Sequence, residues 1–459
     1  MLIAQQSAEI LPSAWSLVPC LVVLVVAVFT RRTVEPLLLG ALFGFGLVSQ
    51  SGFFGEFIGS LLKVMGDGDV VWIVLVCGLF GALIRVLVLS GAAEALGDAM
   101  ASVVRGRRGV LLGTWLLGIL VFVDDYLNAL TVGATMRRLA DRFGISRAML
   151  AYVVDSTAAP VCVLVPMSTW ALYVSGLLEE NGVAEAGAGL TTYVGVAPLV
   201  IYAWVAMGVV LLVALGLIPA IGPMQSEERL TSESREQEPE LDESSSAQTG
   251  WLKALTFVVP IALLVGATLW MGGDDDTRVL KAILFAIAAA IPLAWFSSER
   301  SLPELLDGAL EGIGRMIPAL AIIVLSFVLK DVNDRLGLTP YVIDTFGPLM
   351  TKSLLPAVVF VAISLVTFST GSFWGTFAIT LPIVVPLAQE LRVSIPLAVG
   401  AVISAGAFGS HACFYGDATV LSSTACGVNN MTHAVTQAPY AVASAVLTVM
   451  IYLLLGVVL

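Results

Sequence analysis

The stretch Val121-Phe-Val-Asp-Asp-Tyr-Leu-Asn128 places two adjacent carboxylates, Asp124 and Asp125, inside a long apolar region. A charged side chain at membrane depth costs about 3 kcal/mol on insertion scales, so such residues persist mainly where they have a use. In the whole chain 58% of residues are hydrophobic, 12% are charged, and the mean hydropathy is +0.97. Because a soluble domain has about 25% charged residues, this composition indicates a polytopic membrane protein.

An acidic segment at 224–250 divides the chain into two long apolar parts. Eight acidic residues lie between Glu227 and Glu243, against two arginines, and serine and glutamine are frequent there. Such a segment buries too little apolar surface to offset its ordering entropy, which predicts a flexible, solvated connector. Residues 1–223 and 251–459 then form two transmembrane units, with no room for a large soluble domain.

The apolar run at 110–123 is too short to cross a membrane. About 14 residues with a rise of 1.5 Å each reach about 21 Å of a core about 30 Å thick. Arginines flank the unit on both sides, at 105–108 and 137–147. A true crossing would leave one cluster outside, against the positive-inside tendency. The pattern predicts a re-entrant hairpin at about 110–136, with Asp124, Asp125 and Tyr126 at its tip near the midplane.

A broken helix is predicted at about 149–178, interrupted at Asp155-Ser-Thr-Ala-Ala-Pro160. Pro160 lacks a backbone donor and clashes with the preceding turn, so the carbonyls before it are free to meet an ion. The break therefore adds hydroxyls and carbonyls to the Asp155 carboxylate.

The second half repeats this plan. Residues 87–97 align without a gap on 327–337, and this register places a second hairpin at about 354–386 and a second broken helix at about 395–427. Each half would hold five spans and one hairpin, an odd number of crossings. We therefore expect an all-α polytopic membrane protein with two inverted-topology repeats, each of about five transmembrane helices plus a re-entrant hairpin, and with broken helices at the midplane.

Several motifs resemble the NhaC-type sodium/proton antiporter family of the ion transporter superfamily. They are Phe122-Val-Asp-Asp-Tyr126, Ile145-Ser-Arg147, Leu150-Ala-Tyr-Val-Val-Asp-Ser-Thr-Ala-Ala-Pro160, Pro166-Met-Ser-Thr-Trp170 and Asp417-Ala-Thr-Val-Leu-Ser-Ser423. The resemblance implies an ion-coupled exchanger with inverted repeats and with hairpins that enter from both faces. It leaves the substrate open, since relatives include exchangers of organic acids.

The polar residues at the breaks are the candidate site. Carboxylates, hydroxyls and carbonyls suit a hard cation, and Na⁺ is expected at Asp125, Asp155, Ser156 and Thr157. The full set of candidate ion-binding residues is Asp124, Asp125, Asn128, Asp155, Ser156, Thr157, Ser369, Thr370, Ser372, His411, Asp417 and Thr419. Aromatic residues that could line a pocket for an organic cation are Tyr126, Trp170, Phe373 and Trp374. His433 is expected in a cytoplasmic loop.

These observations predict a secondary transporter, not an enzyme, that exchanges Na⁺ for H⁺ by alternating access at a carboxylate site near the midplane. Transport of a small organic solute coupled to Na⁺ or H⁺ (an amino acid, amine or carboxylate) is the main alternative. An intramembrane aspartyl protease is a third reading, against which the repeats argue. The expected partners are Na⁺, H⁺ and membrane lipids, with a homodimer left open and with no cofactor and no nucleic acid. The expected location is the inner (cell) membrane, with both termini outside and the linker in the cytoplasm.

Overall fold

The computed structural model describes residues 13–30, 32, 34–49, 52–92, 95, 106–122, 125–166, 168–237, 247–270, 275–371 and 373–458. In this part of the chain the regular structure is entirely helical. The protein is an all-α, multi-pass membrane protein. By length and composition, five of the described helices can cross a membrane, or up to seven if each bent pair is one span. The expectation of five spans in each half stays a prediction.

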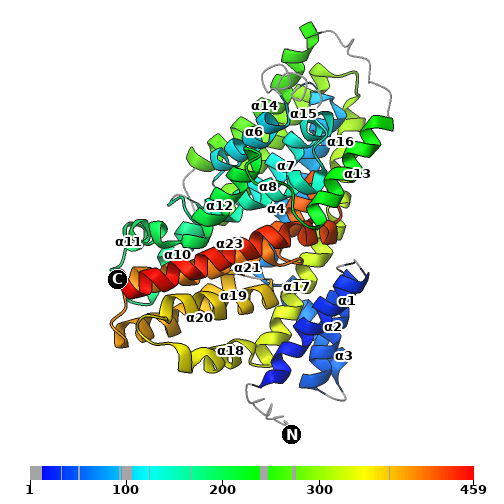
Figure 1. The fold of residues 1–459 in the computed structure, drawn as a ribbon. Coiled ribbons are helices and arrows are strands. Elements are labelled where there is room, and N and C mark those ends of the chain that lie inside the picture. The colour runs from blue at the N-terminus through cyan, green and yellow to red at the C-terminus, as the bar shows by residue number, and fades with distance from the viewer. Residues whose placement is uncertain are drawn as a thin grey trace.

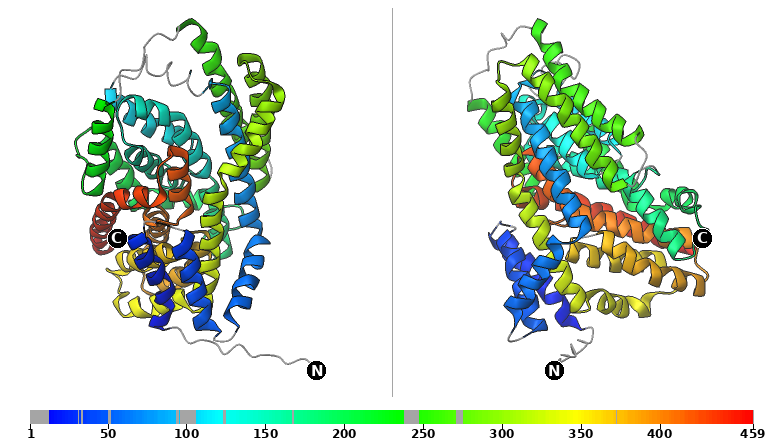
Figure 2. Two further views of the ribbon diagram at one scale, coloured as in Figure 1. Left: turned by 90° about the vertical axis from the view of Figure 1, so that its right-hand side faces the viewer. Right: turned by 180° about the vertical axis from the view of Figure 1, so that it is seen from behind.

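The N-terminal helices form a group that packs against a helix of the second half (Figures 1 and 2). Their bounds are η1 Ala14–Leu17, α1 Val18–Thr30, α2 Val34–Val48, α3 Phe53–Met65 and α4 Gly68–Leu89. Helices α2 and α3 meet at an angle of 119°. Together with α1 they lie beside α17 (Ile317–Arg335), whereas α4 packs mainly against α15 and α16.

The rest of the first half contains short helices separated by breaks. They are α6 Gly106–Leu120, α7 Asp125–Arg142, α8 Arg147–Thr157, α9 Ala159–Cys162, α10 Thr169–Glu180, α11 Gly189–Val196, η2 Ala197–Leu199 and α12 Ile201–Ala214. Ser146 starts α8, because its hydroxyl accepts a hydrogen bond from the amide of Met149 over 3.1 Å. Pro160 lies in the first turn of α9, where its missing donor costs nothing, and the chain bends at Ala158 just before it.

The second half is preceded by α13, a helix that the sequence did not predict. The helices are α13 Pro223–Gln237, α14 Ala247–Trp270, α15 Asp275–Ser297, α16 Leu302–Arg315, α17, α18 Leu338–Phe346, η3 Gly347–Leu349, α19 Leu355–Thr370, α20 Phe373–Glu390, α21 Ile395–Ala412, α22 Asp417–Cys426 and α23 Asn430–Val458. Large apolar side chains such as Trp270 and Phe296 are exposed on this half, as expected for surfaces that face lipid.

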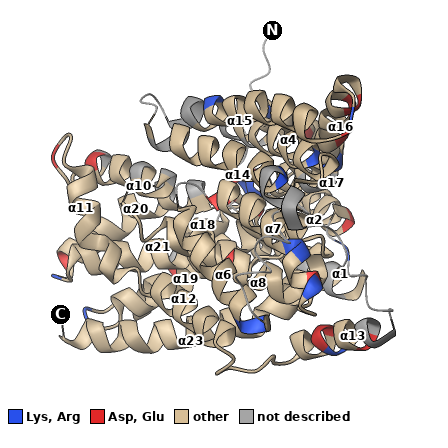
Figure 3. Cartoon of the chain, turned by 90° about the horizontal axis from the view of Figure 1, so that it is seen from above, with Lys and Arg blue, Asp and Glu red and all other residues tan. Residues whose placement is uncertain are grey.

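The sequence predicts a flexible connector at 224–250, and the first part of this segment is helical, in α13. The reason is a set of contacts that composition could not predict. Glu228 forms an ion pair with Arg107 of α6, and its other oxygen accepts hydrogen bonds from the amide and hydroxyl of Ser146, over 3.1 and 2.6 Å. Charged side chains gather on α13, on α16 and at the ends of α7 and α8, whereas the middle of the molecule has few (Figure 3).

The start of α6 and the end of α7 lie close together. Arg107 lies in the first turn of α6 and Ser146 follows α7, yet both contact the one carboxylate of Glu228. Gly118 brings α6 against α8, since a Cβ there would lie 2.2 Å from Thr157 Oγ1. The pair therefore leaves one end of the molecule and returns to it.

Helix α23 runs from that end to the other. Its 29 residues span about 43 Å, more than the hydrocarbon core. Just before it, the carbonyl of Gly427 accepts a hydrogen bond from Arg147 over 3.2 Å. Near its end, Gly456 packs on the carbonyl of Ser353, two residues before the start of α19. The start of α6 and the end of α7 thus lie at one end of α23, and the start of α19 lies at the other, as Figure 1 shows.

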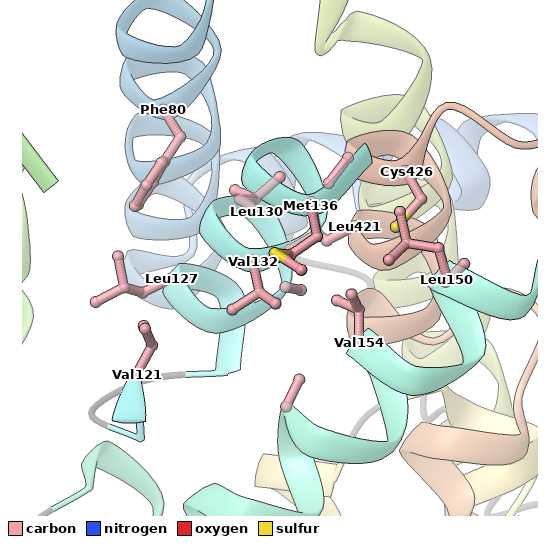
Figure 4. Close-up of a cluster of buried hydrophobic side chains, with 14 of the residues drawn as sticks. Phe80, Val121, Leu127, Leu130, Val132, Met136, Leu150, Val154, Leu421 and Cys426 are labelled. Atoms are coloured by element: carbon pink, nitrogen blue, oxygen red, sulfur yellow. The ribbon is translucent and has the colours of Figure 1, made fainter. Parts of the chain in front are cut away.

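A buried apolar cluster surrounds α7 and fixes its position against α4, α8 and α22 (Figure 4). Its side chains include Phe80 of α4, Leu127 and Met136 of α7, Val154 of α8 and Leu421 of α22. Gly133 allows α7 to approach α22 closely, because a Cβ at that position would lie 2.6 Å from the Ala425 side chain. Polar side chains on these helices are consequently held in a closely packed environment.

Candidate functional site

The breaks of the first and second halves meet around Asp155, at the end of α8. The carboxylate is fully buried, and its Oδ2 accepts three hydrogen bonds: 3.2 Å from Thr419 Oγ1 on α22, 3.2 Å from His433 Nε2 and 2.7 Å from Gln437 Nε2, both on α23. Its Oδ1 has no hydrogen-bond partner among the described residues. No lysine or arginine in the described part contacts this carboxylate.

Asp417 is the second buried carboxylate of this region, in the first turn of α22. The hydroxyl of Tyr126 on α7 donates to Asp417 Oδ2, and the amide of Ala418 donates to Oδ1 over 2.8 Å. Asp417 precedes Thr419, a donor to Asp155, by two residues on α22, so both carboxylates belong to one buried region. Because like charges in a buried site disfavour one another, the region favours binding of a cation or a proton.

His411 links the same region to α12. Its Nδ1 lies 2.7 Å from the hydroxyl of Tyr202, and its Nε2 lies 3.0 Å from the hydroxyl of Ser156. The imidazole also stacks on Tyr152, with ring centroids 6.5 Å apart. His411 is therefore held from two sides in a hydrogen-bonded chain that ends next to Asp155.

Comparison with known proteins identifies the family. The model of the Na⁺/H⁺ antiporter family matches residues 161–457, a range that includes α10 to α22 and nearly all of α23. The chain belongs to the Na⁺/H⁺ antiporter family. It is also similar to a protein of Haemophilus influenzae described only as an uncharacterized protein, with 30% identity over 480 aligned positions that cover 97% of this chain and 91% of the relative. Membership makes the chain a transporter, with Na⁺ and H⁺ as the transported ions.

In this antiporter, two of the predicted residues from the first half, Asn128 and Thr157, make hydrogen bonds to backbone carbonyls near the break. Asn128 is fully buried, and its Nδ2 donates to the carbonyls of Gly118, Val121 and Thr157, over 2.6, 3.1 and 2.9 Å. Thr157 Oγ1 donates to the carbonyls of its own helix, at Val153 and Val154. Asn128 thus ties the ends of α6 and α8 together, and these carbonyls are already occupied.

Asp125 is buried in the first turn of α7, one residue before Tyr126. Its neighbour Asp124 lies outside the described residues, as does Ser372 in the second half. The side chain of Trp374 is also outside the described part. The expected Na⁺ site at Asp125, Asp155, Ser156 and Thr157 stays a prediction, in which the Ser156 and Thr157 hydroxyls already have partners.

The predicted residues Ser369 and Thr370 lie at the end of α19, where they form hydrogen bonds that involve backbone carbonyls. The carbonyl of Ser369 accepts hydrogen bonds from Cys20 Sγ over 3.1 Å, Asn333 Nδ2 over 3.4 Å and the Tyr415 hydroxyl over 2.9 Å. Thr370 Oγ1 donates to the carbonyl of Val366 in its own helix. The φ of +66° at Gly371 then ends α19 in the left-handed region, where glycine is favoured.

The aromatic residues that could line a pocket pack against each other. The rings of Trp170 on α10 and Phe373 on α20 are stacked with centroids 3.5 Å apart, and both side chains are fully buried. Tyr126 is also fully buried and holds Asp417. These side chains fill space between helices.

Sequence reasoning missed three polar residues of the site. His433 was expected in a cytoplasmic loop, which is wrong: it is fully buried on α23 and contacts Asp155. Gln437 and Tyr202 were not considered. The spacing of His433 and Gln437, four residues apart at the start of a long apolar helix, places both on one helix face and was the available signal.

Proposed function

We propose that this antiporter exchanges Na⁺ for H⁺ by alternating access at a buried carboxylate site with Asp155 at its centre. One observation carries the proposal: Asp155 is fully buried and its Oδ2 is saturated by three donors, while its Oδ1 has no hydrogen-bond partner in the described structure. An oxygen of this kind is available to a cation or to a proton.

Competition between the two ions follows from the charge of the site. A buried carboxylate without a lysine or arginine partner is costly to leave uncompensated. Na⁺ bound at Asp155 Oδ1, or a proton on the carboxyl group, removes that cost, and the two cannot occupy the same oxygen. Asp417 adds negative charge nearby and strengthens the preference for a positive ion. Exposure of the site to each side in turn then couples the movement of one ion to that of the other.

The NhaC-type architecture of the ion transporter superfamily is part of the proposal, with two inverted repeats and oppositely inserted hairpins. Its support is the placement of the helix ends. Helices α6 and α7 begin and end beside Glu228 at the start of α23, whereas α19 begins beside Gly456 at the end of α23. The proposal places the paired breaks α8/α9 and α21/α22 between these ends, near mid-membrane.

Orientation in the cell membrane follows from the arginines. Arg107, Arg142 and Arg147 lie at the end of the molecule where α13 docks through Glu228. Because positive charge is concentrated on the cytoplasmic side, this end and the linker are proposed to face the cytoplasm of the cell (inner) membrane.

The test is ion exchange by the purified protein in liposomes that contain a pH-sensitive dye. An imposed Na⁺ gradient should move protons in the opposite direction, and equal gradients of choline should not. Absence of Na⁺-dependent proton movement across pH 6–9 would contradict the proposal. Proton movement that appears only when an amino acid, amine or carboxylate is added would instead support coupled transport of an organic solute.

A further inference from the structure

The carboxamide of Gln437 has an orientation that its partners determine. The side chain is 1% exposed, and its Nε2 donates to Asp155 Oδ2 over 2.7 Å and to the backbone carbonyl of His411. Both partners, the Asp155 carboxylate and the His411 carbonyl, are hydrogen-bond acceptors. The NH₂ group of Gln437 must therefore face them. The amide oxygen, Oε1, then points elsewhere, and it has no hydrogen-bond partner among the described residues.

Gln437 Oε1 belongs to a group of buried oxygens in the same state. Asp155 Oδ1 and Ser422 Oγ are also without a hydrogen-bond partner in the described structure. Ser422 follows Thr419 by three residues on α22, so the two share a helix face, and Thr419 itself donates to Asp155. Buried acceptors normally have partners, since an unsatisfied one costs about 1–3 kcal/mol. Carboxylate, amide and hydroxyl oxygens are the ligand type that a hard cation uses.

We propose that Gln437 supplies a neutral oxygen ligand to the transported Na⁺, beside Asp155 Oδ1, and that this ligand favours Na⁺ over Li⁺. The inference rests on the proposed function, because it assigns a second ligand to the same ion. A neutral ligand adds coordination without a second negative charge, so one carboxylate balances one monovalent ion. It also brings α23, the helix that runs between both ends of the molecule, into direct contact with the ion.

Selectivity follows from the number of ligands. Na⁺ is larger than Li⁺ and uses more oxygen ligands, so removal of one oxygen should weaken Na⁺ binding more than Li⁺ binding, since cation selectivity depends on cavity size and ligand number. A residue that only positions Asp155 would change the binding of both ions by the same factor. The ratio of the two affinities therefore separates a ligand from a positioning residue.

The experiment measures thermal stabilisation of the purified full-length protein by NaCl and by LiCl, at constant ionic strength set with choline chloride. For Gln437→Met, which is similar in size but lacks the amide, we expect the half-stabilising Na⁺ concentration to rise about tenfold, as for the loss of one interaction with an ion. The Li⁺ concentration should rise clearly less. The control is Thr436→Val on the same helix, because Thr436 is also buried but donates to the carbonyl of His433. It should leave the Na⁺ to Li⁺ ratio unchanged.

An unchanged Na⁺ affinity in Gln437→Met, or equal weakening for Na⁺ and Li⁺, overturns the ligand assignment. If Gln437→Met does not fold, Gln437→Asn is the second variant: it keeps the amide but withdraws the oxygen by one methylene, and the same fall in the Na⁺ to Li⁺ ratio is expected. A wild-type protein with no Na⁺-dependent stabilisation contradicts the proposed function together with this inference. Loss of stabilisation in Asp155→Asn with none in the Gln437 variants contradicts the inference alone.

Discussion

His433 Nε2 lies 3.2 Å from Asp155 Oδ2, although 278 positions separate the two residues in the sequence. The contact joins α23 of the second half to the broken helix of the first. It is one of the three hydrogen bonds that hold Asp155 Oδ2 and so leave Oδ1 available.

Replacement of His433 by alanine should weaken Na⁺ binding. Loss of a hydrogen bond to a charged group costs about 1.5–3 kcal/mol, so the half-saturating Na⁺ concentration of the liposome assay should rise about tenfold or more. His433→Gln places an amide donor near the position of Nε2 and should recover most of the affinity. Equal loss of Na⁺ affinity in the two variants would show that the hydrogen-bond donor to Asp155 is not required.

The hydroxyl of Tyr126 should be required for full transport. Tyr126→Phe removes the donor to Asp417 Oδ2 and leaves that buried oxygen without it. We expect a lower rate of Na⁺-driven proton movement and a melting temperature lower by a few degrees, since an unsatisfied buried acceptor costs about 1–3 kcal/mol. The matched control is Tyr193→Phe, whose hydroxyl donates to the carbonyl of Val163 away from Asp417. It should lose stability but keep the transport rate per folded molecule.

The close approach of α6 and α8 should tolerate no side chain at Gly118. In Gly118→Ala the added Cβ would lie 2.2 Å from Thr157 Oγ1, so α6 must move away from the end of α8. Overpacking of this kind costs about 1–3 kcal/mol and would displace the backbone next to Asp155. Gly113→Ala on the same helix is the control, because its Cβ would lie 3.7 Å from the Met136 side chain. The measurements are thermal unfolding and proton flux of both variants, and only Gly118→Ala should be impaired. Similar behaviour of the two would contradict the packing argument.

The contact of Glu228 on α13 with Arg107 and Ser146 should depend on the salt concentration. Glu228→Gln removes the ion pair with Arg107 and weakens the bonds to Ser146. Both side chains are partly exposed, so we expect a loss of only about 0.5–1 kcal/mol at low salt and a smaller loss at high salt. Melting temperatures in dilute and concentrated KCl measure this, and the Arg107→Gln, Glu228→Gln double variant should resemble either single one. A salt-independent difference would rule out an electrostatic clamp.

The two helix pairs should be accessible from opposite sides of the membrane. Arg142 at the end of α7 and Lys352 before α19 are exposed, and the five native cysteines are buried. Single cysteines at Arg142 and Lys352 should therefore react with an impermeant maleimide from opposite faces of oriented vesicles. Reaction of both from the same face would contradict the inverted arrangement.

Much of this organisation could be predicted where the sequence itself interrupts an apolar run. Pro160 marks the broken helix of the first half, and Asp155 and Asp417 stand out because a carboxylate is rare among apolar residues. The second break was expected near 404–410, at Gly406 and Gly409, which is wrong: α21 continues to Ala412 and the chain breaks just after it, because Gly406 and Gly409 serve close packing against Phe377 and Thr367. Gln437 does not interrupt an apolar run in this way, and its spacing of four residues from His433 acquires a meaning only when tertiary packing brings α23 against α8. Contacts between distant segments also decide the structure of α13, whose composition alone indicates a solvated connector.

In the proposed mechanism, Na⁺ and a proton exclude each other at Asp155. The most direct measurement is the release of protons when Na⁺ is added to the purified protein in weakly buffered detergent solution, followed with a pH indicator. Binding of a metal ion at a protonated ligand releases on the order of one proton per ion. We predict this release for the wild-type protein near the pH at which it transports, and its loss in Asp155→Asn. Na⁺ binding without proton release, or the same release from Asp155→Asn, would contradict the account.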